Sequence, residues 1–279
     1  MRILVTGVRG MLGQDVLREL TIQGQICLGA DRDDFDLRDA DAVRSAVTAS
    51  RPDAIVHCAA YTAVDQAESD AENCMAVNAA GTANIARAAR DAGAKLVYIS
   101  TDYVLDGSGS EPREVTDPPR PLNVYGLSKL QGEEAVRALV QRHFILRISW
   151  LFGHGGRNFV DTIRRLGREK PCISVVDDQI GSPTYTIDLA RLIARMLPTD
   201  RYGTYHTTNE GFCSFAQFAA AILRFEASLC QVLPIPSDQY PAIARRPLNS
   251  RLSKRALDEN GFPRMPHWED ALQRYLTEG

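Results

Sequence analysis

A repeated succession of short apolar runs and amphipathic helical patterns most constrains the fold of this chain of 279 residues. It begins with "RILVTG", a run of strand formers that ends in Gly7, and continues into the helical pattern "GMLGQDVLREL". Further apolar runs, with helical patterns between them, follow as "QICLGAD", "DAIVHCAA", "KLVYIST" and "FILRISWLFG". Strands that are apolar throughout are typical of a parallel sheet with helices on both faces. The pattern predicts an α/β fold with a doubly wound, Rossmann-like parallel sheet.

The alternation loosens after residue 150, where a smaller and more irregular region is expected. Helical patterns such as "NFVDTIRRLGREK" and "SFAQFAAAILRFEA" stand among extended stretches, and the proline-rich "VLPIPSDQYPAIARRPLNSRL" predicts mostly loop. We therefore expect a dinucleotide-binding domain at residues 1–150 that also receives the returning segment at about 174–207. Residues 151–279 are expected to form a discontinuous, mixed substrate-binding region that caps the open end of the sheet.

Composition excludes several classes of protein. The chain is 44% hydrophobic and 24% charged, as soluble globular proteins are, and its net charge of -3 is unlike that of a nucleic-acid-binding protein. No apolar run approaches the roughly 18 residues that would span a membrane, and the start of the chain lacks a signal-peptide pattern. The six cysteines show no CxxC spacing, which argues against zinc and predicts reduced thiols in the cytoplasm.

The first glycine turn predicts a site for a dinucleotide. "TGVRGMLG" puts Gly7, Gly10 and Gly13 directly after the first strand, with Met11 and Leu12 opening the helix. The three glycines would allow, in turn, a tight turn, close approach of a pyrophosphate to the backbone, and packing of the helix on the sheet. The anion would lie at the helix N-terminus. A merely tight strand–helix turn is the alternative.

Two residues after the second strand bear on the choice between NADH and NADPH. Asp31 is about where a carboxylate meets the adenosine ribose, whereas the adjacent Arg32 would pair with a 2′-phosphate. The sequence supports both cofactors. Beyond them, the adenine is expected to be flanked by Asp36 and Leu37, and the small residues after the third strand would let the backbone pass the diphosphate and ribose at Ala59, Ala60, Tyr61 and Thr62.

Two further motifs predict a catalytic group at the carboxyl ends of the strands. Tyr125 and Lys129 in "NVYGLSKLQGE" are one helical turn apart, so both side chains can face one site. A neighbouring ammonium would favour the phenolate and lower the pKa of the tyrosine, as a general acid–base requires. The pair alone is equally compatible with surface residues. "YISTDYV" adds the hydroxyls of Ser100 and Thr101 at a strand end, where open α/β sheets bind ligands.

With these motifs in order, the chain resembles the extended short-chain dehydrogenase/reductases and, more narrowly, the dTDP-4-dehydrorhamnose reductase family. The narrower resemblance covers most of the chain and is carried by "STDYVLDG" (100–107), "EVTDPPRPLNVYGLSKLQGE" (114–133), "LRISWLFG" (146–153), "NFVDTIRRL" (158–166), "VVDDQIGSPT" (175–184) and "RRPLNSRL" (245–252). It implies that NADPH or NADH delivers a hydride to C4 of dTDP-4-dehydro-β-L-rhamnose. It also implies that a cytoplasmic enzyme takes a nucleotide sugar as its small-molecule partner, without nucleic acid or membrane, and it leaves a homodimer open.

The resemblance assigns roles to residues at the matching positions. It implies Thr101, Tyr125 and Lys129 as the catalytic triad, with Tyr125 as proton donor, Lys129 also on the ribose, and Asp102 and Trp150 near the sugar. Asn78 matches a helix asparagine that supports the active-site lysine in the superfamily, although a buried structural asparagine is equally consistent. Asn123 either caps its helix or touches the substrate.

The resemblance also bears on the substrate diphosphate and on a metal. Arg245, Arg246 and Arg251 are candidates to meet the diphosphate, since a guanidinium pairs bidentately with phosphate, and we select Arg246; a solvated cluster of charges is the alternative. Some family members carry Mg²⁺ at a dimer interface formed by acidic residues. Asp15 and Asp188 fall near comparable positions, but aspartate is shorter than the expected glutamate, so we predict no metal.

Two other functions remain open from the sequence. One is a different nucleotide-sugar 4-reductase or epimerase, which would use the same fold and cofactor. The other is a non-catalytic regulatory subunit similar to the methionine adenosyltransferase β subunit. Stoichiometric consumption of reduced cofactor would separate a reductase from an epimerase and from a regulatory subunit, and the sugar product would separate it from a different 4-reductase.

Overall fold

A six-stranded parallel sheet forms the centre of the computed structural model, which describes residues 1–277. In order across the sheet, the strands are β10 (Gly203–His206), β5 (His143–Ile148), β4 (Lys95–Thr101), β3 (Ala54–His57), β1 (Arg2–Thr6) and β2 (Ile26–Ala30). Every neighbouring pair is parallel. The predicted doubly wound sheet is confirmed. Its edge strand β10 comes from the second half of the chain, and residues 278–279 of the predicted C-terminal region lie outside the described residues.

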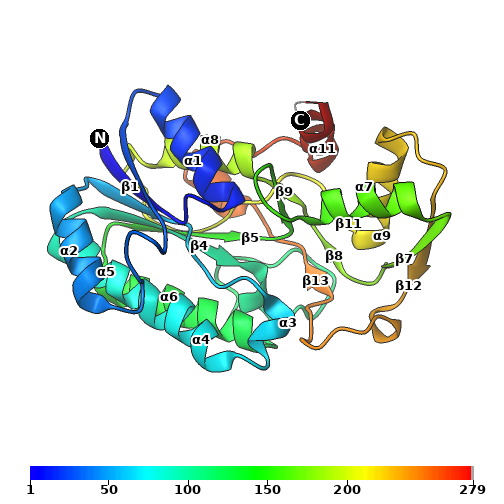
Figure 1. Cartoon of the computed structure of the whole chain (residues 1–279), viewed down its shortest axis with the longest axis horizontal. Coiled ribbons are helices and arrows are strands. Elements are labelled where there is room, and N and C mark those ends of the chain that lie inside the picture. Colours follow the sequence, from blue (N-terminus) through cyan, green and yellow to red (C-terminus); the bar gives the residue numbers. More distant parts are fainter. Residues whose placement is uncertain (278–279) are drawn as a thin grey trace.

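Helices cover both faces of the sheet (Figure 1). On one face lie α1 (Met11–Ile22) and α8 (Thr186–Met196). On the other lie α2 (Ala40–Ser50), α5 (Thr82–Asp91) and α6 (Val124–Leu139). Successive strand residues point to opposite faces, so Ile3 and Val5 pack with α1 and α8 while Leu4 packs with α2 and α5. This explains why the strands are apolar throughout.

The helical segment at residues 71–91, between β3 and β4, is not one continuous α-helix. It consists of α4 (Ala71–Met75), a π-helical stretch at Ala76–Gly81, and α5, and it follows the short α3 (Val64–Ala67). π-Helical turns inside α-helices are frequently found at functional sites. The stretch carries Asn78, whose contacts are described below.

The remaining elements form a second, mixed region with an aromatic core. β7 (Cys172–Val176) pairs with β12 (Gln231–Ile235), β6 (Leu151–Phe152) pairs with β9 (Thr184–Tyr185), and β8 (Ile180–Gly181) lies between β11 (Cys213–Ser214) and β13 (Asn249–Ser250). Around them lie α7 (Phe159–Glu169), α9 (Phe215–Phe225), α10 (Arg255–Glu259) and α11 (Trp268–Thr277). The core includes Phe152, Phe218 and Trp268. β12 falls where we predicted loop; Pro234 is tolerated because β12 lies at the edge of a two-stranded sheet.

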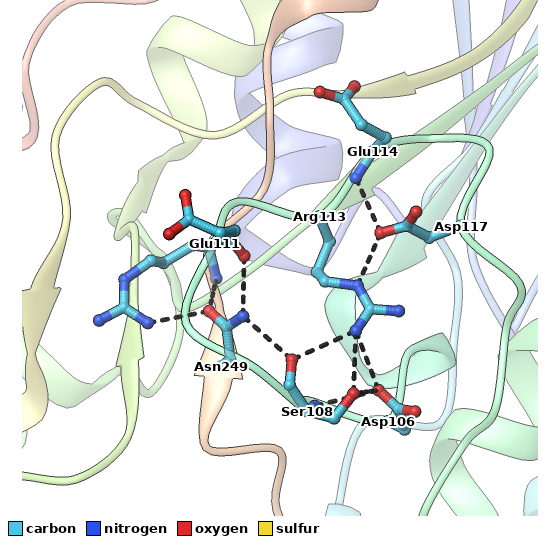
Figure 2. Close-up of polar contacts among 8 residues, drawn as sticks. Asp106, Ser108, Glu111, Arg113, Glu114, Asp117 and Asn249 are labelled. Atoms are coloured by element: carbon cyan, nitrogen blue, oxygen red, sulfur yellow. Dashed lines mark hydrogen bonds and ion pairs between the residues drawn. The ribbon is translucent and has the colours of Figure 1, made fainter.

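A hub of hydrogen bonds ties the loop after β4 to the C-terminal segment, as Figure 2 shows. The Arg113 guanidinium donates to Asp117 Oδ2 at 2.7 Å and to Asp106 Oδ1 at 3.2 Å. From the other side, Asn249 Nδ2 donates to the Glu111 carbonyl at 2.9 Å. Backbone hydrogen bonds between Arg113 and the segment at 251–253 complete the junction. The loop that leads from the end of β4 to α6 is therefore held by the second region.

Within residues 1–277, none of the helices combines the length and the apolar character that crossing a membrane requires.

Candidate active site

A cavity of about 900 Å³ opens at the carboxyl ends of the parallel strands. This is the size of a small-molecule site, and it lies where open α/β sheets bind ligands. All fifteen residues predicted to contact the cofactor line it, from Gly7 to Lys129, as do Thr101, Asp102 and Trp150. Arg246 does not line it. Residues that the sequence analysis did not select also contribute, among them Arg9, Phe35, Tyr103, Arg157 and Phe215.

The glycine turn has the close contacts that its spacing predicts. Gly7 has a φ of 72°, and a Cβ there would lie 2.6 Å from the Ala59 nitrogen. A Cβ on Gly13 would lie 2.1 Å from the Gly7 carbonyl oxygen. Gly10 precedes α1 with an extended backbone, and no side chain of residues 1–277 caps that helix. The first N–H groups of α1 are therefore available to an anion at the cavity.

Asp31 stands at the end of β2 beside the turn. Its carboxylate accepts hydrogen bonds from the backbone nitrogens of Arg9, at 2.9 Å, and Arg32, at 2.8 Å. Two carboxylate oxygens offer about four acceptor positions, so acceptors remain for ribose hydroxyls. The exposed Arg32 side chain forms no ion pair within the described part of the chain, whereas Arg9 pairs with Asp33 at 2.5 Å. Arg32 is thus the unpaired cation at this end of the cavity.

Farther along the same wall, Asp36 and Leu37 follow β2. The Asp36 carboxylate is paired with Arg38 through contacts of 2.6 to 3.0 Å, which lowers the pKa of Asp36. Leu37 presses against Gly81, where a Cβ would lie 2.9 Å from the leucine Cβ, and its carbonyl accepts from Asn84. Leu37 therefore offers an apolar surface where the adenine is expected, whereas the Asp36 carboxylate is already paired with Arg38.

Asn78 holds the backbone that follows β3. Its side chain accepts from the Tyr61 nitrogen at 2.8 Å and donates to the Tyr61 carbonyl at 3.0 Å. It also donates to Ser128 Oγ on α6 at 2.9 Å. This buried amide supports the structural interpretation of Asn78: it fixes the stretch from Ala59 to Thr62 against the helix that carries Tyr125 and Lys129.

Tyr125 and Lys129 lie in the first turns of α6, which begins after a specific cap. The Asn123 side chain accepts from the Gly126 nitrogen at 2.7 Å, and its amide donates to the Arg245 carbonyl at 2.8 Å. Asparagine is a preferred N-cap residue. Asn123 thus caps the helix, as one of the two sequence-based interpretations held, and joins it to the C-terminal segment.

The electrostatics of the pair differ from the expectation. Burial and the nearby Asp102 carboxylate raise the pKa of Tyr125 well above its usual value, although the Thr101 hydroxyl works in the opposite direction. The predicted lowering by Lys129 is therefore wrong for this arrangement. Burial also lowers the pKa of Lys129 to about 7, against the opposing effect of Glu133. A phenol with a raised pKa is protonated at neutral pH, so Tyr125 has a proton to donate.

Thr101 and Asp102 end strand β4 at the floor of the cavity. The Thr101 hydroxyl donates to Asp102 Oδ1 at 2.9 Å. Asp102 is only 3% exposed, and its Oδ2 has no hydrogen-bond partner within residues 1–277. Burial raises the pKa of Asp102 to about 6, partly opposed by the Ser250 hydroxyl. A buried carboxylate oxygen without a partner needs a donor.

Trp150 forms the wall on the side of the second region. Its φ is 50°, and its ring stacks on Phe215 with centroids 3.8 Å apart. The indole is partly exposed and lines the cavity. A flat aromatic surface in the cavity that Asp102 and Tyr125 also line is suited to a sugar ring.

Arg246 does not line the cavity, although it interacts with Tyr103, which does. Its guanidinium is bidentate to Asp65 on α3, at 3.0 and 2.7 Å, and the Ala244 nitrogen donates to the same carboxylate. Arg251 is bound to Asn249, whereas the Arg245 side chain is exposed. The role of Arg246 at a substrate diphosphate stays a prediction, and the contact seen here instead fastens the C-terminal segment to α3.

The acidic residues discussed for a metal already have partners. Asp15 accepts from the Thr186 hydroxyl at 2.5 Å. Asp188 is bidentate to Arg274, at 2.9 and 2.7 Å, and accepts from Asn209. Residues 1–277 contain no group of three or more His, Cys, Asp or Glu side chains that could hold an ion. Because a guanidinium occupies the Asp188 carboxylate, these residues do not fit Mg²⁺.

Comparisons with known proteins agree over the whole chain. The family model described as "RmlD substrate binding domain" matches residues 1–279. The spore coat polysaccharide biosynthesis protein SpsK of Bacillus subtilis is 39% identical, over 99% of this chain and 97% of the relative. The dTDP-4-dehydrorhamnose reductase of Burkholderia thailandensis is 38% identical, over 98% of this chain and 97% of the relative.

Solved structures show the same similarity. The dTDP-4-dehydrorhamnose reductase of Bacillus anthracis, in complex with NADP, has a TM-score of 0.97 and 43% identity, and covers 100% of this chain and 99% of its own. A UDP-glucose 4-epimerase of Thermus thermophilus, in complex with NAD, has a TM-score of 0.85 at 23% identity over 99% of this chain and 98% of its own, and shows the fold alone.

Proposed function

The chain belongs to the RmlD substrate binding domain family, and from this premise we propose that it is an NAD(P)H-dependent oxidoreductase that reduces the C4 keto group of dTDP-4-dehydro-β-L-rhamnose to give dTDP-L-rhamnose. The observation that carries the proposal is the match to relatives named dTDP-4-dehydrorhamnose reductase over nearly the full length of both chains. The cavity supports it, since it joins a dinucleotide turn to Thr101, Tyr125 and Lys129.

The residues of the cavity fit a nicotinamide dinucleotide, which supplies the hydride when bound. The N-terminus of α1 and the close turn at Gly7 and Gly10 would hold the diphosphate. Asp31 would accept from the adenosine ribose, and Arg32 would meet a 2′-phosphate where one is present. The backbone fixed by Asn78 would lie along the second ribose.

The protonated state of Tyr125 identifies the source of the proton that the reduction needs. As C4 of the sugar accepts the hydride, charge develops on its oxygen, and the protonated phenol of Tyr125 gives up its proton to that oxygen. Thr101 would orient the oxygen by a hydrogen bond. The Lys129 ammonium stabilises the tyrosinate that is left, until a proton from water restores the phenol. Asp102 Oδ2, which has no hydrogen-bond partner within residues 1–277, accepts a hydrogen bond from a hydroxyl of the sugar.

The proposal includes the setting of the reaction. A nucleotide sugar is the small-molecule partner, and the reaction takes place in the cytoplasm without nucleic acid or membrane. The alternative of an epimerase predicts no net oxidation of cofactor, and the alternative of a regulatory subunit predicts cofactor binding without turnover.

The direct test incubates the protein with dTDP-4-dehydrorhamnose, generated in situ, and with NADPH or NADH. We expect stoichiometric loss of the reduced-cofactor absorbance and formation of dTDP-L-rhamnose. Absence of cofactor oxidation with both nucleotides would refute the proposal.

A matched pair of variants tests the proton donor. Tyr125→Phe keeps the ring and removes the acidic proton, so we expect turnover to fall at least about 100-fold while cofactor binding persists. Tyr202→Phe is the control, because that hydroxyl donates to the exposed Asp200 at 2.6 Å and Tyr202 does not line the cavity. Near-normal turnover of Tyr125→Phe would show that another group donates the proton.

A further inference from the structure

The ammonium of Lys129 has an unusual environment. Lys129 is 3% exposed, yet within residues 1–277 no oxygen accepts a hydrogen bond from its Nζ. An aromatic ring lies against it, since Nζ is 4.2 Å from the centroid of Tyr98. A cation within about 6 Å of the centre of a tyrosine ring is attracted by the negative face of the ring.

Tyr98 is held firmly in this position. It lies on β4 and is 0% exposed, and its hydroxyl donates to the backbone carbonyl of Lys129 at 3.3 Å. A Cβ on Gly132 would lie 2.2 Å from that hydroxyl, so only a glycine at this position of α6 leaves room for it. The ring is also stacked with His57, with centroids 6.0 Å apart and planes 23° apart.

The other titratable groups around Lys129 do not take over the role of the ring in stabilising its ammonium. Glu133 on α6 favours the charged form, but its carboxylate is taken up by Ser100 at 2.6 Å and by Arg147 at 2.9 Å. Cys58 after β3 and Cys74 on α4 are thiols whose pKa burial raises, so both are neutral at pH 7. His57 on β3 is neutral as well, because burial lowers its pKa to about 3.

We propose that Tyr98 is a positioning residue for the reduction: its ring is the platform that holds the Lys129 ammonium at the cavity floor and favours its charged form. The inference rests on the proposed function, because it gives Tyr98 its role through Lys129. Tyr98 itself remains a neutral phenol, since burial raises its pKa well above the usual value. It therefore takes part through its ring and not through a proton.

The consequence is a shift in a titration. Burial disfavours the ammonium and the ring favours it, so removing the ring makes Lys129 lose its proton at a lower pH. A cation–π interaction of ordinary strength corresponds to a shift of about 0.5 to 1.5 pH units. Turnover falls as pH rises through this titration, because neutral Lys129 no longer stabilises the tyrosinate. The alkaline limb of the pH–rate profile should shift by the same amount.

Two variants separate the ring from the hydroxyl. Tyr98→Phe keeps the ring under Lys129 and should keep both the titration and the alkaline limb. Tyr98→Leu removes the ring and should shift both to lower pH. The chain contains only four lysines, at 95, 129, 170 and 254, so the titration of Lys129 can be followed directly by the side-chain Cε signals in NMR. Lys129→Met identifies the signal.

The outcomes are distinct. Equal lysine titrations in Tyr98→Leu and the wild type would overturn the proposal, as would an equal shift in Tyr98→Phe and Tyr98→Leu. In the wild type, the Tyr98 ring under Nζ should also shift the NMR signals of the Lys129 Hε protons upfield. Absence of that shift would overturn the proposal even if Tyr98→Leu did not fold. The NMR measurements need no turnover, so they stand apart from failure of the protein to reduce the nucleotide sugar.

Discussion

The glycine turn offers the sharpest test of how the chain holds its cofactor, because two of its glycines are predicted to fail in different ways. A Cβ on Gly13 would lie 2.1 Å from the Gly7 carbonyl oxygen and 2.9 Å from the Val8 Cα, both backbone atoms. Gly13→Ala must therefore displace the start of α1. A Cβ on Gly10 would meet only the Gly7 carbonyl oxygen, at 3.3 Å, and the backbone there, with φ -82° and ψ 158°, suits alanine.

The magnitudes follow from these contacts. For Gly13→Ala, forced displacement of packed backbone should cost about 3 kcal/mol or more of the free energy of unfolding. For Gly10→Ala we expect a change within about 1 kcal/mol, because the tight contact offsets the lower entropy of the unfolded chain. The added methyl group nevertheless lies where a diphosphate would approach the backbone. Affinity for NADPH should fall at least about tenfold, which corresponds to about 1.4 kcal/mol.

Urea unfolding and fluorescence titration with NADPH measure the two quantities separately. Gly24→Ala is the control, since Gly24 has a φ of 76° but nothing within 4 Å of its Cβ. It should cost about 1 to 2 kcal/mol of backbone strain and leave NADPH affinity unchanged. The reasoning is refuted if Gly10→Ala binds NADPH as the wild type does, or if Gly13→Ala is as stable as the wild type.

Three further predictions concern stability and can be read from urea unfolding. Arg113→Ala should lower the free energy of unfolding by about 2 kcal/mol, because it removes charge-assisted hydrogen bonds of a largely buried guanidinium. The control Arg44→Ala, at an exposed ion pair, should change stability by less than about 0.5 kcal/mol. Equal losses in the two variants would contradict this reasoning. Glu133→Gln should cost about 3 to 5 kcal/mol, since it leaves a buried arginine charge uncompensated; a loss under about 1 kcal/mol would rule that out. Burial lowers the pKa of His57 and His206 to about 3, so between about pH 6.5 and 3 the unfolded chain binds protons that the native protein does not. The free energy of unfolding should therefore fall as pH decreases from about 6.5 toward 3. A flat profile in that window would show that one or both histidines become charged in the folded protein.

Local sequence patterns were sufficient where the physics is local. The glycine spacing after β1 was predicted to form a tight dinucleotide turn, and the structure has the close contacts that this requires. The Asn123 cap was one of two open interpretations, because asparagine before a helix has a strong local preference. The β12 strand was missed, since Pro234 and the prolines that follow the strand are typical of loop and only the pairing with β7 made it a strand.

Contacts between distant segments were beyond the reach of sequence reasoning. Arg246 was expected at a diphosphate from the resemblance and from guanidinium chemistry, and its pairing with Asp65, 181 positions away in the chain, was not foreseen. Asn78 was left open between support of a lysine and a buried structural role, and the structure gives its partners as the Tyr61 backbone and Ser128. No spacing rule identifies such a partner, because the fold alone brings the two residues together.

The sequence by itself determined the parallel sheet, the position of the dinucleotide turn and the chain order of Thr101, Tyr125 and Lys129. These follow from periodicity and turn chemistry within a few residues. Only the tertiary structure decided the protonation states and the supporting contacts: a raised pKa for Tyr125, a lowered pKa for Lys129, and the Tyr98 ring beneath its ammonium. Desolvation and cation–π attraction depend on all the groups that surround an atom, and β3, β4, α4 and α6 supply them together.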